Sequence, residues 1–248
     1  MQEEMSFRGR SALVTGGAIR VGRAIALELA RAGASVTVHY RRSEAEAQRT
    51  ALDLRALGVQ ATVAQADLTQ DGAPERLVAS HLAAHGGLDF LVNSAAEFER
   101  VPAAELDRAR FEAMLSANLT APFLLARAAL EPLRERRGAI VNLVDLCGTT
   151  QVWRGYAHYA AAKAGLAALT KLLALEWAPE VRVNAVAPGT VLFPESLDAA
   201  ERKRIVSRIP AGERGAPEDV ARAVRFLLAQ PFVTGQVLAV DGGRSLVP

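Results

Sequence analysis

The sequence is poor in cysteine and in lysine, and each shortage excludes something. Cys147 is the single cysteine among 248 residues, which excludes an intrachain disulfide and a thiolate metal cluster. We expect it to be an ordinary half-buried thiol in a reducing compartment. The four histidines also lack the spacing of a metal site, so we predict no metal. The only lysines are Lys163, Lys171 and Lys203, and a lysine inside a motif is therefore a strong signal.

Long apolar runs and an excess of one charge are missing as well. No run of about 18 apolar residues occurs, and the start of the chain, MQEEMSFRGR, lacks the apolar stretch of a signal peptide. The 29 basic residues nearly balance the 27 acidic ones, which gives no reason to expect a nucleic-acid or membrane surface. We therefore expect a soluble cytoplasmic protein with a small-molecule substrate.

Short β-branched runs alternate with longer Ala, Leu and Arg stretches of helical period. The strand candidates are residues 11–15, 35–40, 61–66, 89–94, 139–144, 181–187 and 237–241. Strands separated by helix-length segments require right-handed βαβ crossovers, and hence a mainly parallel sheet with helices on both faces. No linker or repeat divides the chain. We predict an α/β fold, a single doubly wound (Rossmann-type) domain over residues 1–248 with a seven-stranded sheet.

Functional residues are expected just after the strands, because ligands of doubly wound sheets bind outside the carboxyl ends of the strands. The first such segment, TGGAIRVG, places Gly16, Gly17 and Gly22 in a turn that can bring backbone amides and a helix N-terminus against a pyrophosphate. Arg20 stands where a nucleotide-binding loop usually has its middle glycine. By themselves, these glycines are also consistent with an ordinary turn between a strand and a helix.

The end of the second strand candidate indicates which nucleotide is bound. A protein that prefers NAD usually has an acid there to hold the ribose 2′-hydroxyl, whereas this chain reads VHYRRS. Arg41 and Arg42 are suited to grip a 2′-phosphate, and Arg20 can reach the same group. We therefore predict NADPH/NADP+ as the cofactor. The alternative is that the two arginines only solvate a strand end.

Tyr159 and Lys163 in YAAAK lie one turn apart on the same face of a predicted helix. A phenol has a pKa of roughly 10, so it exchanges protons poorly near neutral pH unless a fixed cation favours the phenolate. Lys163 can be that cation. The spacing alone is a common accident, but here it follows a strand in a chain that already has a nucleotide turn.

Over essentially its whole length, the chain resembles the short-chain dehydrogenase/reductases. The segments that carry the resemblance are TGGAIRVG, ADL, NSAA, SANLT, YAAAK, VRVNAVAPG and VDGG. The resemblance implies that Tyr159 is the general acid, that Lys163 tunes it and binds ribose, and that Asn118 holds a water. It implies homotetramers through the segments 104–137 and 153–178. The implied cofactor-binding residues are Gly16, Arg20, Val21, Gly22, Tyr40, Arg41, Arg42, Ser43, Asp67, Leu68, Asn93, Ala95, Tyr159, Lys163, Pro188, Gly189 and Thr190.

Asp145 departs from the family pattern, which has a serine at this position to bind a substrate carbonyl. An ionised carboxylate only accepts hydrogen bonds and repels a developing oxyanion, so a plain ketone fits poorly. Aspartate here, Arg20, HYRRS and Phe98 resemble the pteridine reductases and bacterial dihydromonapterin (dihydrofolate) reductases. In those families the aromatic ring stacks on the pterin. Alone, Asp145 is also consistent with a turn residue, and Phe98 with simple packing.

The resemblance implies NADPH-dependent reduction of a pterin C=N bond, with Phe98, Asp145 and Tyr159 at the substrate. The alternatives are a carbonyl reductase of the same family, acting on a 3-oxoacyl group or another ketone, and a catalytically silent NADP-binding sensor. Residues 190–210 are expected to form a substrate lid. Tyr156 faces either the substrate or the core, and His158, opposite Tyr159 on the helix, is expected at the surface.

Overall fold

The computed structural model describes residues 6–193 and 197–247. Within them a seven-stranded sheet has the order β3-β2-β1-β4-β5-β6-β7, and every pairing between neighbours is parallel. The strands are β1 (Ser11–Val14), β2 (Ser35–Tyr40), β3 (Ala61–Gln65), β4 (Phe90–Asn93), β5 (Ala139–Leu143), β6 (Arg182–Pro188) and β7 (Val237–Val240). The predicted fold class is confirmed, and each predicted strand overlaps an observed one.

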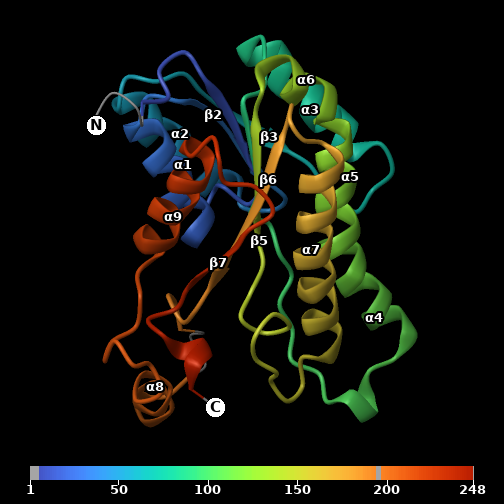
Figure 1. Ribbon diagram of the computed structural model, residues 1–248, viewed down its shortest axis with the longest axis vertical. Coiled ribbons are helices and arrows are strands. Elements are labelled where there is room, and N and C mark those ends of the chain that lie inside the picture. The colour runs from blue at the N-terminus through green and yellow to red at the C-terminus, as the bar shows by residue number, and fades with distance from the viewer. Residues whose placement is uncertain (1–5, 194–196, 248) are drawn as a thin grey trace.

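Helices cover both faces of this sheet. Helices α1, α2 and α9 lie on one side in Figure 1, and α3, α5 and α7 lie on the other. The helices are α1 (Arg20–Arg31), α2 (Glu44–Ala56), α3 (Ala73–His85), α4 (Arg108–Leu115), α5 (Ala121–Ala128), α6 (Leu130–Arg136), α7 (Ala157–Glu176), α8 (Ala199–Val206) and α9 (Pro217–Ala229). A π-helical turn, Ser116–Thr120, joins α4 to α5.

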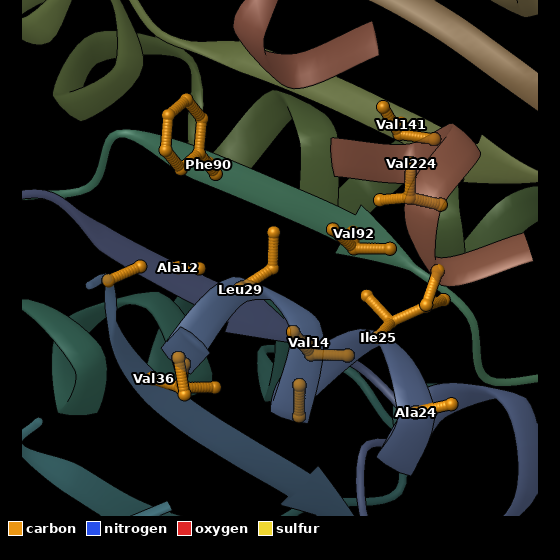
Figure 2. Packing of buried hydrophobic residues seen from close by; sticks show 14 of the residues in the cluster. Ala12, Val14, Ala24, Ile25, Leu29, Val36, Phe90, Val92, Val141 and Val224 are labelled. Carbon is orange, nitrogen blue, oxygen red and sulfur yellow. The ribbon is translucent and has the colours of Figure 1, made fainter. Parts of the chain in front are cut away.

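The alternation of side chains along the central strands builds two cores. In β1, Val14 packs into the cluster on the α1 and α9 side, whereas Leu13 packs into the cluster on the opposite side. Figure 2 shows the first cluster, where Ile25 of α1 and Val224 of α9 lie over Val92 of β4. Burying one such side chain contributes about 1.5–3 kcal/mol to stability. The sheet therefore packs apolar side chains on both of its faces.

The described residues also bear on two expectations from the sequence, which concern membrane-spanning helices and metal sites. No single described helix is long and apolar enough to cross a membrane; only the bent pair Arg108–Ala128 and Leu130–Arg136, at 53°, meets those criteria together. Within the described ranges, no group of three or more His, Cys, Asp or Glu side chains could hold a metal ion.

A buried histidine network joins α3 to the first three strands. His81 Nδ1 lies 2.8 Å from Thr37 Oγ1, and His81 Nε2 lies 3.1 Å from the carbonyl oxygen of Gly87. His85 Nε2 also lies 3.1 Å from Thr37 Oγ1, and the two rings are 4.8 Å apart. Burial, together with the neighbouring His85, lowers the pKa of His81 to about 4. Burial lowers the pKa of His85 as well. The fold therefore favours two neutral imidazoles.

This network predicts acid sensitivity. Because the pKa of His81 is depressed in the folded state, its contribution to stability is present above its unfolded pKa of about 6.5 and is lost as pH falls toward about 4. Between pH 7 and pH 5, wild type should lose about 2 kcal/mol through this group. Urea unfolding at both pH values should show the loss in wild type and a smaller one in His81→Gln. An equal loss in both proteins would show that other groups cause the sensitivity.

Candidate active site

The candidate site lies where the sheet connections change direction. The chain runs from β1 outward to β2 and β3, and then returns to β4 on the other side of β1. Loops after β1 and β4 therefore diverge at a topological switch point, the usual ligand crevice of such sheets. Thr15 joins the two loops, since its Oγ1 accepts hydrogen bonds from the backbone N–H groups of Ser94 (2.9 Å) and Ala95 (3.0 Å).

The glycine loop has the close backbone packing that a nucleotide site requires. A Cβ atom at Gly22 would lie 2.1 Å from the carbonyl oxygen of Gly16, so only glycine fits there. Arg20 has a φ of +54°, in the left-handed region that favours glycine, and its side chain is exposed. The first turn of α1, which includes Val21, carries no acidic residue. These residues fit the pyrophosphate of a dinucleotide, with the helix N-terminus directed toward it.

His39 holds this loop, a role that sequence reasoning missed. The ring is 2% exposed; its Nδ1 accepts a hydrogen bond from the Gly16 N–H (3.2 Å), and its Nε2 lies 3.0 Å from the Ala66 carbonyl oxygen. The Gly17 N–H donates to the His39 carbonyl oxygen at 3.0 Å. Nε2 must therefore carry the proton, and burial lowers the pKa of the ring. The only sequence signal was the histidine at the end of the strand 35–40.

Removing the His39 acceptor should weaken cofactor binding selectively. His39→Leu leaves the Gly16 N–H without its partner, so we expect the KM for the nicotinamide cofactor to rise about tenfold, with little change in the KM for substrate. His39→Asn, which retains a side-chain acceptor, should recover part of the affinity. Steady-state kinetics and thermal melting of both variants check this, and a rise in both KM values together would indicate general destabilisation instead.

The ends of β2 and β3 hold the residues predicted to select the nucleotide. Arg41 forms an ion pair with Glu97, from the loop after β4, whereas Arg42 is exposed. Asp67 accepts hydrogen bonds from the side chain and the backbone of Thr69; these bonds and the nearby charges of Arg41 and Arg42 hold the pKa of its carboxyl below the usual range. Tyr40 is the last residue of β2, and Ser43 directly precedes α2. Leu68 follows Asp67 in the loop after β3.

Tyr159 and Lys163 lie on consecutive turns of α7 and are buried, as the spacing predicts. The Tyr159 hydroxyl donates to Asp145 Oδ2 at 2.8 Å. Lys163 Nζ donates to the carbonyl oxygen of Leu143, the last residue of β5, at 2.8 Å, and lies 5.7 Å from the centre of the Tyr159 ring. The strand end and the helix thus bring a phenol, a carboxyl group and an ammonium together.

The electrostatics differ from the sequence prediction for Lys163. Burial, together with Asp145, raises the pKa of Tyr159 above its usual value rather than lowering it. Burial is the main cause, and the geometry adds to it, because the phenol donates to the Asp145 carboxylate whereas Lys163 is directed to a carbonyl oxygen. Burial also raises the pKa of Asp145, against the opposing effects of the Cys147 N–H, Tyr159 and Lys163. Burial lowers the pKa of Lys163 to about 8.

Asp145 also has the local role of a turn residue, because its Oδ1 accepts from the Cys147 N–H at 2.8 Å. The interpretation of Asp145 as a turn residue is therefore confirmed, and its role toward a substrate stays a prediction. Cys147 itself is fully buried rather than half-buried, and burial raises the pKa of its thiol to about 11. A thiol with that pKa is unreactive at neutral pH.

Asn118 lies in the π-helical turn between α4 and α5 and is fully buried. Its Nδ2 donates to the carbonyl oxygens of Glu97 (3.0 Å) and Met114 (3.2 Å). Its Oδ1 has no partner among the described residues, which leaves one buried acceptor for a bound molecule. Asn93 is similar, since its Nδ2 donates to Asn142 Oδ1 at 2.9 Å and its Oδ1 has no partner in the described part of the chain.

The substrate side consists of aromatic rings and the segment after β6. Phe98 stacks on Tyr156, with ring centres 4.8 Å apart, and meets Tyr159 edge to face at 4.9 Å. Pro188 ends β6, and the Gly189 N–H donates to the carbonyl oxygen of Val240. Thr190 begins the predicted lid, which contains α8; its residues 194–196 lie outside the described residues.

The prediction for His158 was wrong. The side chain is fully buried, not at the surface. Helix α7 buries adjacent residues along its first turns, His158 with Tyr159 and Ala162 with Lys163, so its buried stripe is wider than one face. A helical-wheel argument based on Tyr159 alone assumed a single packed face.

The doubly wound sheet, the glycine loop and the buried Tyr159–Lys163 pair together define a short-chain oxidoreductase. Comparison with known proteins supports this class. A family model described as "Enoyl-(Acyl carrier protein) reductase" matches residues 17–245, and the chain belongs to this family.

Named relatives cover nearly the whole chain. One is "3beta-hydroxysteroid dehydrogenase 1" of Eggerthella lenta, 35% identical over 97% of this chain and 95% of its own. Another is the 3-oxoacyl-(acyl-carrier-protein) reductase FabG of Staphylococcus aureus, 33% identical over 94% of this chain and 97% of its own. The resemblance to pteridine reductases finds no counterpart among these relatives.

Solved structures agree with this assignment. A dehydrogenase/reductase from Sinorhizobium meliloti 1021 matches with a TM-score of 0.92 at 36% identity, covering 98% of both chains. A 7α-hydroxysteroid dehydrogenase, in complex with NADH and 7-oxo glycochenodeoxycholic acid, matches with a TM-score of 0.93 at 26% identity, covering 98% of this chain and 97% of its own.

Proposed function

We propose that this protein is an NADP(H)-dependent short-chain oxidoreductase that interconverts a carbonyl and a hydroxyl group on a small molecule. The observation that carries the proposal is the triangle of the buried Tyr159 and Lys163 with the half-buried Asp145 at the carboxyl end of β5, in a sheet whose β1 leads into the glycine loop. The relatives act, by their names, on a hydroxysteroid and on a 3-oxoacyl group, and both chemistries take place at a carbonyl or alcohol carbon.

The preference for NADP(H) rests on charge at the end of β2. The two residues after Tyr40 are arginines, and no acid stands there to hold a 2′-hydroxyl. Since Arg41 is paired with Glu97, we assign the main 2′-phosphate contact to Arg42, with Ser43 and Arg20 beside it. The nicotinamide supplies or accepts the hydride when bound.

Side chains of this protein donate the proton that the substrate oxygen receives during reduction, and they restore it afterwards. In the direction of reduction, the Tyr159 hydroxyl gives its proton to the substrate oxygen as the hydride reaches the carbon. In its protonated form, Asp145 would donate a hydrogen bond to the substrate oxygen as a serine would, and burial raises the pKa of its carboxyl above the usual value. The Lys163 ammonium, whose pKa is about 8, can then return a proton to Tyr159, and the free Oδ1 of Asn118 can accept a hydrogen bond from a water that relays this proton.

A second candidate function is pterin reduction, favoured by one observation. Asp145 replaces the usual hydroxyl and accepts a hydrogen bond from the Tyr159 hydroxyl at 2.8 Å, an arrangement suited to a ring that offers N–H groups. Phe98 beside Tyr159 provides a stacking surface for such a ring. The proton for the C=N nitrogen would come from the same Tyr159 hydroxyl.

One substrate panel tests both functions. Consumption of NADPH, and of NADH in parallel, would be followed with a 3-oxo steroid, a 3-oxoacyl thioester, dihydrobiopterin and dihydromonapterin. Turnover of a ketone supports the proposed function, and turnover of a pterin alone would replace it with the second candidate. Tight NADPH binding without any turnover would contradict both and favour a silent sensor.

We also propose that the chain assembles into homotetramers through the segments 104–137 and 153–178. Leu172 and Leu175 of α7 support this, because both are exposed apolar side chains on the second segment.

A further inference from the structure

The loop after β4 and the loop before α7 form one aromatic surface beside Tyr159. We call this surface, made of Phe98, Trp153 and Tyr156, the wall. The Val101 N–H donates to the carbonyl oxygen of Gly155 at 2.8 Å, which joins the loop after β4 to the loop before α7. The Phe98 ring stacks on Tyr156, and Trp153 meets Tyr156 edge to face at 5.9 Å. Because each ring rests on another, the wall is built before any ligand arrives.

This wall leaves large aromatic surfaces in contact with solvent. Phe98 is 49% exposed and Trp153 is 39% exposed, although both belong to a cluster that ends at the buried Tyr159. Contiguous exposed aromatic side chains mark interaction sites, and aromatic rings commonly line ligand pockets. A flat or rigid ring system would cover them and gain stacking as well as apolar burial.

The same wall carries a cation, Arg100. Arg100 is exposed, and the aliphatic part of its side chain packs against Gly155. A Cβ atom at Gly155 would lie 2.9 Å from Arg100 Cγ and 3.2 Å from Arg100 Nε. Gly155 has a φ of +85°, so a side chain there would be both strained and in collision with Arg100. The charge of Arg100 opposes the burial that raises the pKa of Tyr156. Its guanidinium is therefore held close to the rings.

The acids in this segment leave Arg100 unpaired. Glu97 forms its ion pair with Arg41, toward the cofactor side. Glu99 is exposed, and neither it nor any other described acid forms an ion pair with Arg100. An unpaired guanidinium at the edge of an aromatic surface is a ready partner for a carboxylate or a phosphate.

We propose that the substrate is a rigid ring compound with its reacting group at one end and an anionic group at the other, the ring lying on Phe98, Tyr156 and Trp153 and the anion pairing with Arg100. This inference rests on the proposed function and specifies its substrate class. The reacting group enters toward Tyr159, at the Phe98 edge of the wall, and the anion stays at the solvent edge beside Gly155.

The test compares an acid with its neutral ester. The probes are a 3-oxo steroid with a carboxylate side chain and the methyl ester of the same compound, so that only the charge differs. Wild type, Arg100→Gln and Arg154→Gln are each loaded with NADPH, and both binding and turnover are measured. Arg154 is the matched control, because it is exposed on the same loop and forms no ion pair in the described residues. Quenching of Trp153 fluorescence reports binding, since the other tryptophan, Trp177, is buried.

We expect wild type and Arg154→Gln to bind the acid about tenfold more tightly than the ester, and Arg100→Gln to lose this preference while binding the ester unchanged. Equal affinity of wild type for acid and ester would overturn the inference, as would an unchanged preference in Arg100→Gln. Turnover is judged separately. Preferential binding of the acid without reduction would support Arg100 as the anion contact and count against the carbonyl chemistry.

Discussion

Replacing Tyr159 with phenylalanine is expected to lower kcat about 10²–10⁴-fold, with little change in NADPH affinity. The hydroxyl is the proton donor of the proposed reaction, and no other described tyrosine touches Asp145. Phenylalanine keeps the ring that packs against Phe98, so the wall and the helix should persist. Single-turnover kinetics with saturating NADPH measure the loss directly.

As a control, the thermal stability and the cofactor affinity of Tyr159→Phe are compared with those of wild type. Lys163 keeps its bond to the Leu143 carbonyl oxygen in the absence of the phenol, so NADPH titration and thermal melting should resemble wild type. If the variant kept more than about a tenth of the wild-type rate, Asp145 or a water would have to be the proton donor. The assignment of Tyr159 would then be wrong.

The second large effect is expected at Asp145. Asp145→Ser should raise kcat/KM for a ketone about tenfold and lower it for a pterin about 100-fold, because a hydroxyl donates to a carbonyl whereas a carboxylate accepts from ring N–H groups. The substitution also removes the carboxylate that helps to raise the pKa of Tyr159. The basic limb of the pH–rate profile should therefore move to lower pH.

The acidic limb provides an independent check on Asp145. In wild type, burial raises the pKa of Asp145, so the carboxyl remains protonated to a higher pH than a free aspartate. Reduction of a ketone should then be faster on the acidic side, and Asp145→Asn, which cannot ionise, should lose this dependence. An unchanged ratio of ketone to pterin turnover in Asp145→Ser would show that Asp145 does not determine substrate choice.

Local patterns account for most of what the sequence predicted correctly. The seven strands were visible because each carries a short β-branched run with residues for two cores, such as Leu13 and Val14 on opposite faces of β1. The placement of Tyr159 and Lys163 followed from helical spacing alone. Such features depend on neighbours in the chain, and a periodicity of two or 3.6 residues is enough to reveal them.

Contacts between distant segments could not be read in this way. Nothing in the spacing indicates that His39 binds the Gly16 N–H, that Arg41 pairs with Glu97, or that the Tyr159 hydroxyl points at Asp145. The last contact reverses the expected shift in the pKa of Tyr159, because burial and a carboxylate outweigh a lysine that is directed elsewhere.

By itself, the sequence determined the class of fold, the position of the glycine loop and the placement of Tyr159 and Lys163 on consecutive turns of one helix, because each is encoded in a local pattern. Only the tertiary structure decided which groups share hydrogen bonds, which histidines are buried, and that Arg41 pairs with Glu97 whereas Arg100 forms no ion pair with a described acid. These properties depend on distance and burial, and both arise when strand ends far apart in the chain meet at one edge of the sheet.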